Sequence, residues 1–103
     1  MSNFNYSAFV NDRNEVFNVS YDPEHPPLPL TLIEISDRRI LGNDMEGFSL
    51  LFHGPKQIGC LEQGTWAMES KEEVGLITLF IVPVGEDEDN YKYEAIINQK
   101  LSN

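Results

Sequence analysis

The sequence predicts an all-β domain with a minor α-helical part: a small six-stranded antiparallel barrel or split barrel with a short N-terminal helix. Short apolar runs recur along the chain with apolar residues at every second position, which is the period of a half-buried strand. Glycine, proline and acidic residues separate these runs, and no long helical pattern lies between them. A two-sheet sandwich would share these features, so barrel and sandwich both stay open at this point.

Length and composition predict one domain over residues 1–103. The chain has 103 residues, of which 41% are hydrophobic and 23% are charged, as in ordinary soluble domains. A second core would leave two halves of marginal size. The longest apolar run is far shorter than the roughly 20 residues of a membrane helix. Because the N-terminus lacks the pattern of a secretory signal, we expect a cytoplasmic protein, unless a dedicated machine exports it in folded form.

The N-terminal third predicts one short helix and two strands. The helix is expected from three apolar residues on one side, with a capping residue before them: Phe4, Ala8 and Phe9, after Ser2 or Asn3. Apolar and polar residues alternate over residues 16–21 and again over 30–36, as in strands. Four prolines lie within residues 22–29, where they fix φ and remove ladder donors. That segment is therefore expected to be an extended connection and not a central strand.

The rest of the chain predicts four further strands, over residues 48–53, 64–69, 74–84 and 91–97. Residues 37–47 are polar with two glycines, which favours a long loop with a turn at Gly42, Asn43 and Asp44. A second loop covers residues 56–63, and charged turns cover 70–73 and 85–90. In the first of these strands Phe48, Leu50 and Phe52 are expected to point into the core.

Residues 74–84 are apolar on both faces of the expected strand. Leu76, Phe80 and Val82 fall on one face, and Ile77, Leu79 and Ile81 fall on the other. Such a strand is typically covered on both sides. The N-terminal helix, barrel closure or a subunit partner would each supply the second cover, and the sequence does not choose among them.

Charge and cysteine content exclude several classes of function. The formal net charge is −10, from 17 acidic and 7 basic residues, and this field repels nucleic acid and anionic lipid. The expected partner is therefore another protein, while monomer and homodimer both stay open. Cys60 is the only cysteine, so an intrachain disulfide and a zinc site built from several thiolates are excluded.

Two groups of residues could carry nucleophilic or metal chemistry. Cys60 is a candidate nucleophile with His53 as its base, but no orienting group or oxyanion-hole motif accompanies them. His25 and His53 are candidate metal ligands with Glu24, yet His25 lies in the proline run, as an exposed connecting residue would. We therefore predict no catalytic residue, no metal and no cofactor.

The acidic turn at residues 86–89 is a weak candidate for calcium. The glycine and the bidentate glutamate of a calcium-binding loop are replaced by Lys92 and Asn98 when the count starts at Asp87. A solvated turn is the preferred interpretation. Glu94 is expected to form a structural ion pair with Arg38 or Arg39. Three aromatic residues could form a surface for a sugar or peptide, but core packing is the preferred role: Trp66, Tyr91 and Tyr93.

Four segments resemble a family of small bacterial all-β proteins of unknown function. They are FSLLFHGP (48–55), LEQGTW (61–66), LFIVPVG (79–85) and YEAIIN (93–98), in that order. The resemblance covers the C-terminal half by residue and the N-terminal half by pattern only. It implies no catalytic residues, and it suggests a link to gene clusters that encode proteins like phage tail collars. The proline-rich segment 22–29 and the acidic residues 86–89 depart from the family pattern, which puts a shared partner in doubt.

These observations favour a non-enzymatic accessory protein-binding module that assists a phage-tail-like or secreted partner. One alternative is an acidic inhibitor or immunity-type protein that blocks a basic partner. Another is a small hydrolase that uses Cys60 and His53. For the binding module, the expected interaction surface comprises sheet edges and two loops, with these residues: Arg38, Arg39, Asn43, Asp44, Lys56, Gln57, Gln63 and Glu94.

Overall fold

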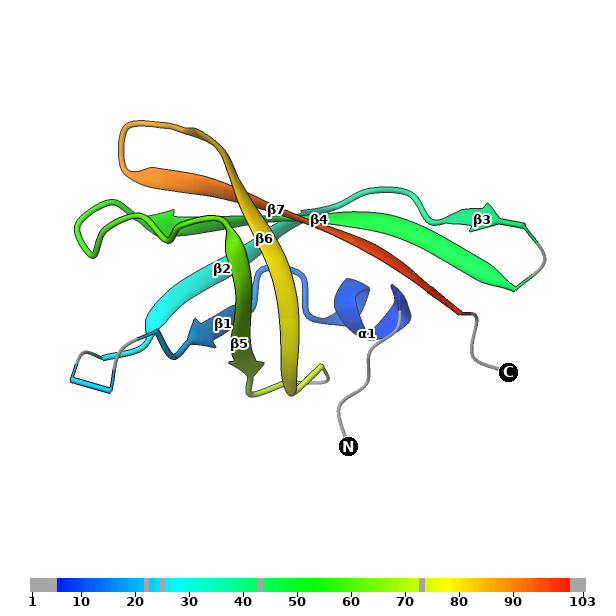
Figure 1. The fold of residues 1–103 in the computed structure, drawn as a ribbon, viewed down its shortest axis with the longest axis horizontal. Helices are drawn as coiled ribbons and strands as arrows, with labels where there is room; N and C mark the ends of the chain where they lie inside the picture. The colour runs from blue at the N-terminus through cyan, green and yellow to red at the C-terminus, as the bar shows by residue number, and fades with distance from the viewer. Residues whose placement is uncertain (1–5, 22, 25, 43, 73, 101–103) are drawn as a thin grey trace.

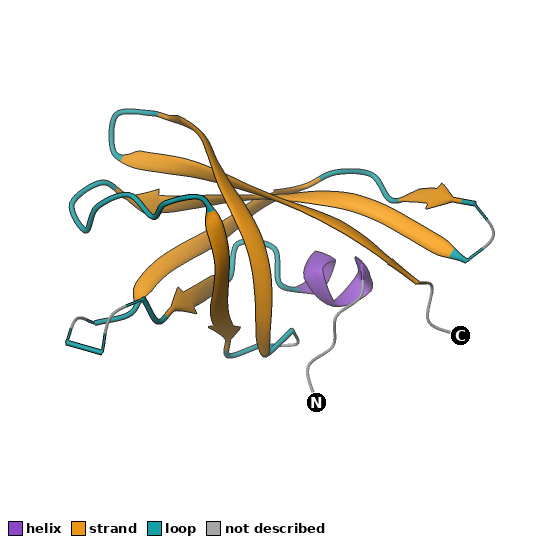
Figure 2. Ribbon diagram, in the orientation of Figure 1, coloured by secondary structure: helices purple, strands orange, loops and turns teal. Residues whose placement is uncertain are grey.

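The computed structural model describes residues 6–21, 23–24, 26–42, 44–72 and 74–100, which form one helix and seven strands (Figure 1 and Figure 2). Within this part of the chain, no helix has the length and apolarity needed to cross a membrane. In chain order the elements are α1 (Tyr6–Asn11), β1 (Val16–Val19), β2 (Leu28–Ile35), β3 (Arg39–Leu41), β4 (Met45–Pro55), β5 (Gly64–Ser70), β6 (Leu76–Glu86) and β7 (Asn90–Lys100).

Antiparallel pairing joins the strands in the order β2-β1-β5-β6-β7-β4-β3. A further antiparallel pairing of β2 with β4 closes six of the strands into a barrel. The seventh, β3, lies outside the barrel beside the first residues of β4, and it forms part of an arm at one end of the longest axis (Figure 1). The predicted antiparallel barrel with a short helix is confirmed, and the sandwich is not the arrangement observed.

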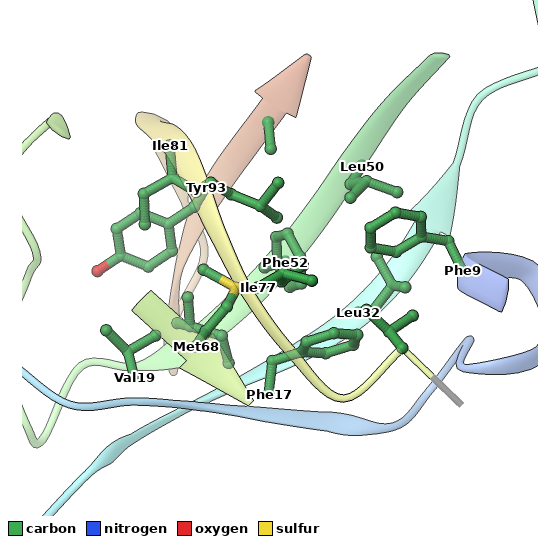
Figure 3. Close-up of a cluster of buried hydrophobic side chains, with 14 of the residues drawn as sticks. Phe9, Phe17, Val19, Leu32, Leu50, Phe52, Met68, Ile77, Ile81 and Tyr93 are labelled. Atoms are coloured by element: carbon green, nitrogen blue, oxygen red, sulfur yellow. The ribbon is translucent and has the colours of Figure 1, made fainter. Parts of the chain in front are cut away.

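Alternate residues of the barrel strands point into one apolar core (Figure 3). Phe17, Phe52 and Tyr93 are fully buried there. The helix α1 contributes Phe9, whose ring centroid lies 6.4 Å from that of Phe17 and 5.7 Å from that of Phe48. The predicted inward positions on β4 and the predicted apolar side of α1 are confirmed. Phe4 and the expected capping residues, Ser2 and Asn3, lie outside the described residues.

Asp12 follows α1 directly and ties the helix to the turn between β5 and β6. Its side chain is completely buried, and its Oδ2 atom accepts hydrogen bonds from the Ser70 hydroxyl and the Val74 backbone N–H, both at 2.9 Å. The Ser70 hydroxyl also accepts a hydrogen bond from the Gly75 N–H at 3.0 Å. A buried carboxylate is tolerated only where such donors replace water. This joint therefore fixes where the chain leaves the helix.

The prediction of one long loop over residues 37–47 is wrong, because this segment contains β3. Ile40 pairs with Glu46, and the hairpin turn between β3 and β4 includes Gly42 in the left-handed region at φ 73°. Asn43, expected in the same turn, lies outside the described residues. With only three residues and an exposed isoleucine, β3 has no alternating pattern to detect, and its pairing with β4 defines it.

The proline-rich segment does not remain outside the sheet along its whole length. Leu28 and Pro29 belong to β2, and Pro29 lies opposite Asn18 of β1. The pairing of β2 with β4 begins only at Thr31, so Pro29 has no neighbour on the β4 side. The missing N–H of Pro29 therefore costs no hydrogen bond on the β4 side. Proline is found in sheets at such positions, where one side of the strand is unpaired.

Of the three covers expected for the second face of residues 74–84, neither the N-terminal helix nor barrel closure lies over it, which leaves the subunit partner. The strand is β6, and only Ile77, Leu79 and Ile81 are buried in the core. On the opposite face Leu76 keeps 61% of its surface exposed and Phe80 keeps 51%. Barrel closure covers the inner face of each strand only, and no described element lies over the outer face of β6 (Figure 1).

Candidate functional site

The structure does not bring the predicted interaction residues together. Arg38, Arg39 and Asp44 belong to the β3–β4 arm, whereas Lys56, Gln57 and Gln63 lie in the loop between β4 and β5. Figure 1 places these two groups at opposite ends of the longest axis. Glu94 lies between them in β7, and Asn43 is outside the described residues. The two predicted loops are therefore not neighbours in the fold.

The predicted ion pair of Glu94 with one of two arginines is not observed among the described residues. Arg38 instead lies beside Glu46, with 3.7 Å between Nε and Oε1, and the Glu46 side chain is buried. Arg39 and Glu94 both line a surface pocket of about 290 Å³ on the outer face of β4 and β7. Glu94 is therefore a pocket residue and not the partner of Arg38.

Lys56 fastens the loop after β4 to the acidic turn between β6 and β7. The Lys56 Nζ lies 2.5 Å from Glu86 Oε2 and 5.6 Å from the centre of the Tyr91 ring. The backbone N–H of Lys56 donates a hydrogen bond to the Asp89 carbonyl at 3.0 Å. The hydrogen bond to Glu86 raises the pKa of the Lys56 ammonium. Lys56 therefore has a structural role at this end of the barrel.

Asp87 forms the acidic turn with its own carboxylate. Its Oδ1 atom accepts hydrogen bonds from the backbone N–H groups of Asp89 and Asn90, at 3.0 and 2.8 Å. These bonds, the one from Asn90 first, hold the pKa of the Asp87 carboxyl below its usual value. Among the described residues, no three His, Cys, Asp or Glu side chains are grouped as a metal site. His25, a predicted candidate ligand, lies outside that part of the chain.

The structure joins Cys60 to Tyr93 and not to His53. The exposed Cys60 thiol donates to the Leu61 carbonyl at 3.4 Å and interacts with the Tyr93 hydroxyl. That hydroxyl accepts the Leu61 N–H at 3.0 Å, and burial raises the pKa of Tyr93 to about 12. The Nε2 atom of His53 is buried without a hydrogen-bond partner among the described residues. In this conformation His53 is therefore not positioned as a base for Cys60.

The aromatic residues weighed as a ligand surface contribute to the core instead. Tyr93 is fully buried, and Trp66 and Tyr91 pack against the core while partly exposed. The indole N–H of Trp66 donates to the Glu62 carbonyl at 3.0 Å. Core packing, the preferred interpretation of these residues, is confirmed.

The feature that sequence reasoning missed is an apolar strip on the outside of the barrel, formed by Leu76, Phe80 and Val82 of β6 with Ile96 of β7. We call it the outer strip. Ile96 has 67% of its surface exposed, and Val82 is half-buried. Because Ile81 pairs with Ala95, the register brings Phe80 beside Ile96. The apolar second face of this segment was the available signal, but the same pattern is expected for a face that the helix or barrel closure covers.

A pocket lies at each end of the outer strip. Ile96 and Glu94 line the pocket of about 290 Å³, and Gly47 of the neighbouring strand β4 lines it as well. Leu76 and Glu69 line a second pocket, of about 220 Å³, over β1 and β5. The strip on β6 and β7, together with the pocket over β4 and β7 at one end and the pocket over β1 and β5 at the other, is the candidate functional site.

Fold and site together define a small antiparallel β-barrel domain with an exposed apolar strip on its outer face. Residues 4–97 match the sequence model of a family described as a domain of unknown function, DUF6916, and the chain belongs to that family. This agrees with the expected membership of a small family of unknown function. Comparisons with curated proteins and with solved structures found no match.

Proposed function

We propose that the domain is a non-enzymatic protein-binding module whose binding surface is the outer strip. The observation that carries the proposal is the exposure of three large apolar side chains on one side of the barrel: Leu76, Phe80 and Ile96 each expose more than half of their surface, and the register brings Phe80 beside Ile96. Single exposed apolar residues are common on soluble proteins, whereas grouped ones with flanking pockets favour an interaction site.

The size of the strip sets the strength of the interaction. Full burial of a large apolar side chain contributes about 1.5–3 kcal/mol, and these four are already partly covered, so about 1 kcal/mol remains for each. About 4 kcal/mol alone corresponds to a complex in the millimolar range. A tighter complex therefore needs contacts in the flanking pockets as well, where Asn98 and Ser49 at one end and Asn18 at the other offer hydrogen-bonding groups.

The arrangement of the candidate catalytic residues supports a role without catalysis. Nucleophilic catalysis needs a base within hydrogen-bond reach of the nucleophile. The Cys60 thiol contacts Leu61 and Tyr93, and the buried Nε2 atom of His53 has no partner among the described residues. The small-hydrolase alternative would therefore require a rearrangement of the loop after β4.

Two kinds of partner fit this proposal. The resemblance of the C-terminal segments suggests an accessory role toward a phage-tail-like or secreted protein. The alternative, an acidic inhibitor of a basic partner, is supported by the net charge of −10 and by the exposed acidic residues in the turn between β6 and β7. Both roles use the same strip and differ in the identity of the partner.

Photo-crosslinking in the cells that naturally produce the protein tests the proposal. A photoreactive phenylalanine analogue at position 80 should form an adduct of one defined mass, because the ring of Phe80 is half exposed in the middle of the strip. The same analogue at Ile58, 46% exposed in the loop after β4, is the control and should not form that adduct. An adduct from Ile58 alone would assign binding to the loop and contradict the proposal.

A further inference from the structure

We infer that the outer strip binds an extended, cationic segment of a protein partner, with two apolar side chains between two basic ones. This inference rests on the proposed function and adds the chemistry of the partner. It follows from the placement of carboxylates around the strip, from the polarity of the positions between them and from the spacing along β6.

One glutamate stands at each end of the β6 part of the strip. Glu69 of β5 lies directly opposite Leu76 and is exposed, and Glu94 of β7 lies directly opposite Val82 and is half-exposed. Each also lines the pocket at its own end. Among the described residues, the pocket beside Leu76 is lined by no basic side chain, and the pocket beside Ile96 is lined by one, Arg39.

The positions between these two glutamates are uncharged. On β5, Ala67 lies opposite Thr78 and Thr65 lies opposite Phe80. Phe80 and its β7 neighbour Ile96 provide the most apolar part of this interval. A bound segment therefore meets a carboxylate, then a neutral and apolar stretch, then a second carboxylate.

The spacing along β6 specifies the segment. Leu76 and Val82 are six residues apart, and six residues of strand span about 20 Å. Because side chains alternate, positions 1, 3, 5 and 7 of an extended segment point to the same face. Lysine or arginine at positions 1 and 7 would reach Glu69 and Glu94, while apolar side chains at positions 3 and 5 would cover Thr78 and Phe80.

The wider charge distribution favours the same partner. Beyond the strip, β6 runs into the turn that holds Asp87, Glu88 and Asp89, all exposed. Three bases lie on the same hairpins, Lys71, Lys92 and Lys100. A second copy of the chain would bring the same carboxylates and a further charge of −10, and phosphate-bearing partners would be repelled in the same way. A basic protein segment has the complementary sign.

An NMR titration with a defined peptide tests this inference. The probe is a seven-residue peptide with lysine at positions 1 and 7, valine at 3 and 5, and serine elsewhere; its counterpart carries glutamate at 1 and 7. At low ionic strength the lysine peptide should shift the resonances of Phe80 and Ile96, and the glutamate peptide should not. Phe80→Thr should abolish the shifts, because it removes the central apolar contact.

Matched variants separate a directed contact from general attraction to an acidic protein. Glu69→Gln should weaken binding of the lysine peptide about threefold, as the loss of one surface ion pair. Glu88→Gln removes the same charge from the β6–β7 turn and should change affinity less than Glu69→Gln. Equal weakening by the two variants, or equal binding of the glutamate peptide, would overturn the inference. A crosslinked partner at position 80 without peptide selectivity would leave the proposed function standing and remove the inference alone.

Discussion

Replacement of Asp12 by alanine should destabilise the domain strongly. The carboxylate is completely buried and accepts hydrogen bonds from the Ser70 hydroxyl and the Val74 N–H at 2.9 Å. A hydrogen bond to a charged group contributes about 1.5–3 kcal/mol, and a buried donor left without an acceptor adds to the loss. We therefore expect Asp12→Ala to lower the free energy of unfolding by about 3–5 kcal/mol, a large fraction of the stability of a small domain.

Urea unfolding followed by the fluorescence of Trp66, the only tryptophan, measures this change. Asp12→Asn keeps one carbonyl oxygen, which in the place of Oδ2 can accept both hydrogen bonds, and it should cost roughly half as much, because only the negative charge of the acceptor is lost. Asp44→Ala is the matched control, since Asp44 is exposed in the turn after β3, and it should change stability by no more than about 0.5 kcal/mol. A loss below about 1 kcal/mol for Asp12→Ala would refute the proposed joint between α1 and the β5–β6 turn.

Three further outcomes are expected. Gly54→Ala should lower the free energy of unfolding by about 1–3 kcal/mol in the same urea assay, because an added Cβ would lie 2.7 Å from Leu30 Cδ2 and 3.0 Å from Tyr93 Cε2. This loss should be smaller in a Leu30→Ala background, where the Leu30 clash is removed. The free energy of unfolding should fall between pH 10 and pH 12 by up to about 1.4 kcal/mol per pH unit. The reason is that the pKa of Tyr93 is raised to about 12 in the folded domain, so the unfolded chain releases this proton at lower pH. In Tyr93→Phe, urea unfolding at the same pH values should lack the part of the fall that Tyr93 causes. Phe80→Thr should have a free energy of unfolding within about 1 kcal/mol of that of the parent chain, because half of the Phe80 surface is already exposed. A larger loss would mean that Phe80 stabilises the fold.

Period-two alternation predicted the inward residues where one face of a strand is apolar and the other polar. Phe48, Leu50 and Phe52 on β4 point into the core as expected, and the alternation over residues 16–21 corresponds to β1, where Phe17 and Val19 are buried. The signal is reliable there because a shift by one residue would expose the whole apolar set. Strand ends were less well predicted, since β4 and β7 run on through polar residues that are held in place by pairing with neighbouring strands and show no alternating pattern.

The arm formed by β3 with the first part of β4 was beyond sequence reasoning. Ile40 is exposed at 55%, so β3 shows no inward face, and three residues are too few for any period. The ion pair of Arg38 with Glu46 was likewise hidden, because it depends on the hairpin register. Contacts set by register across a turn leave no local pattern in the chain.

The candidate site was missed for a different reason. The apolar character of Leu76, Phe80 and Val82 was visible in the sequence, but an apolar outward face has the same pattern whether an element of the chain or a partner covers it. The barrel topology separates the two cases, because β6 pairs with β5 and β7 and its inner face alone meets the core. The glutamates beside the strip depend on pairing across strands and were not predicted as a group.

The central claim, that a partner covers the outer strip, is tested most directly by thiol accessibility at position 80. In a Cys60→Ser background, Phe80→Cys introduces the only thiol, and Val16→Cys, at a residue 41% exposed on β1, gives a matched control. In the purified domain both thiols should react rapidly with a maleimide. In cells that naturally produce the protein, position 80 should become protected while position 16 stays reactive. Equal reactivity of the two positions in those cells would contradict the claim.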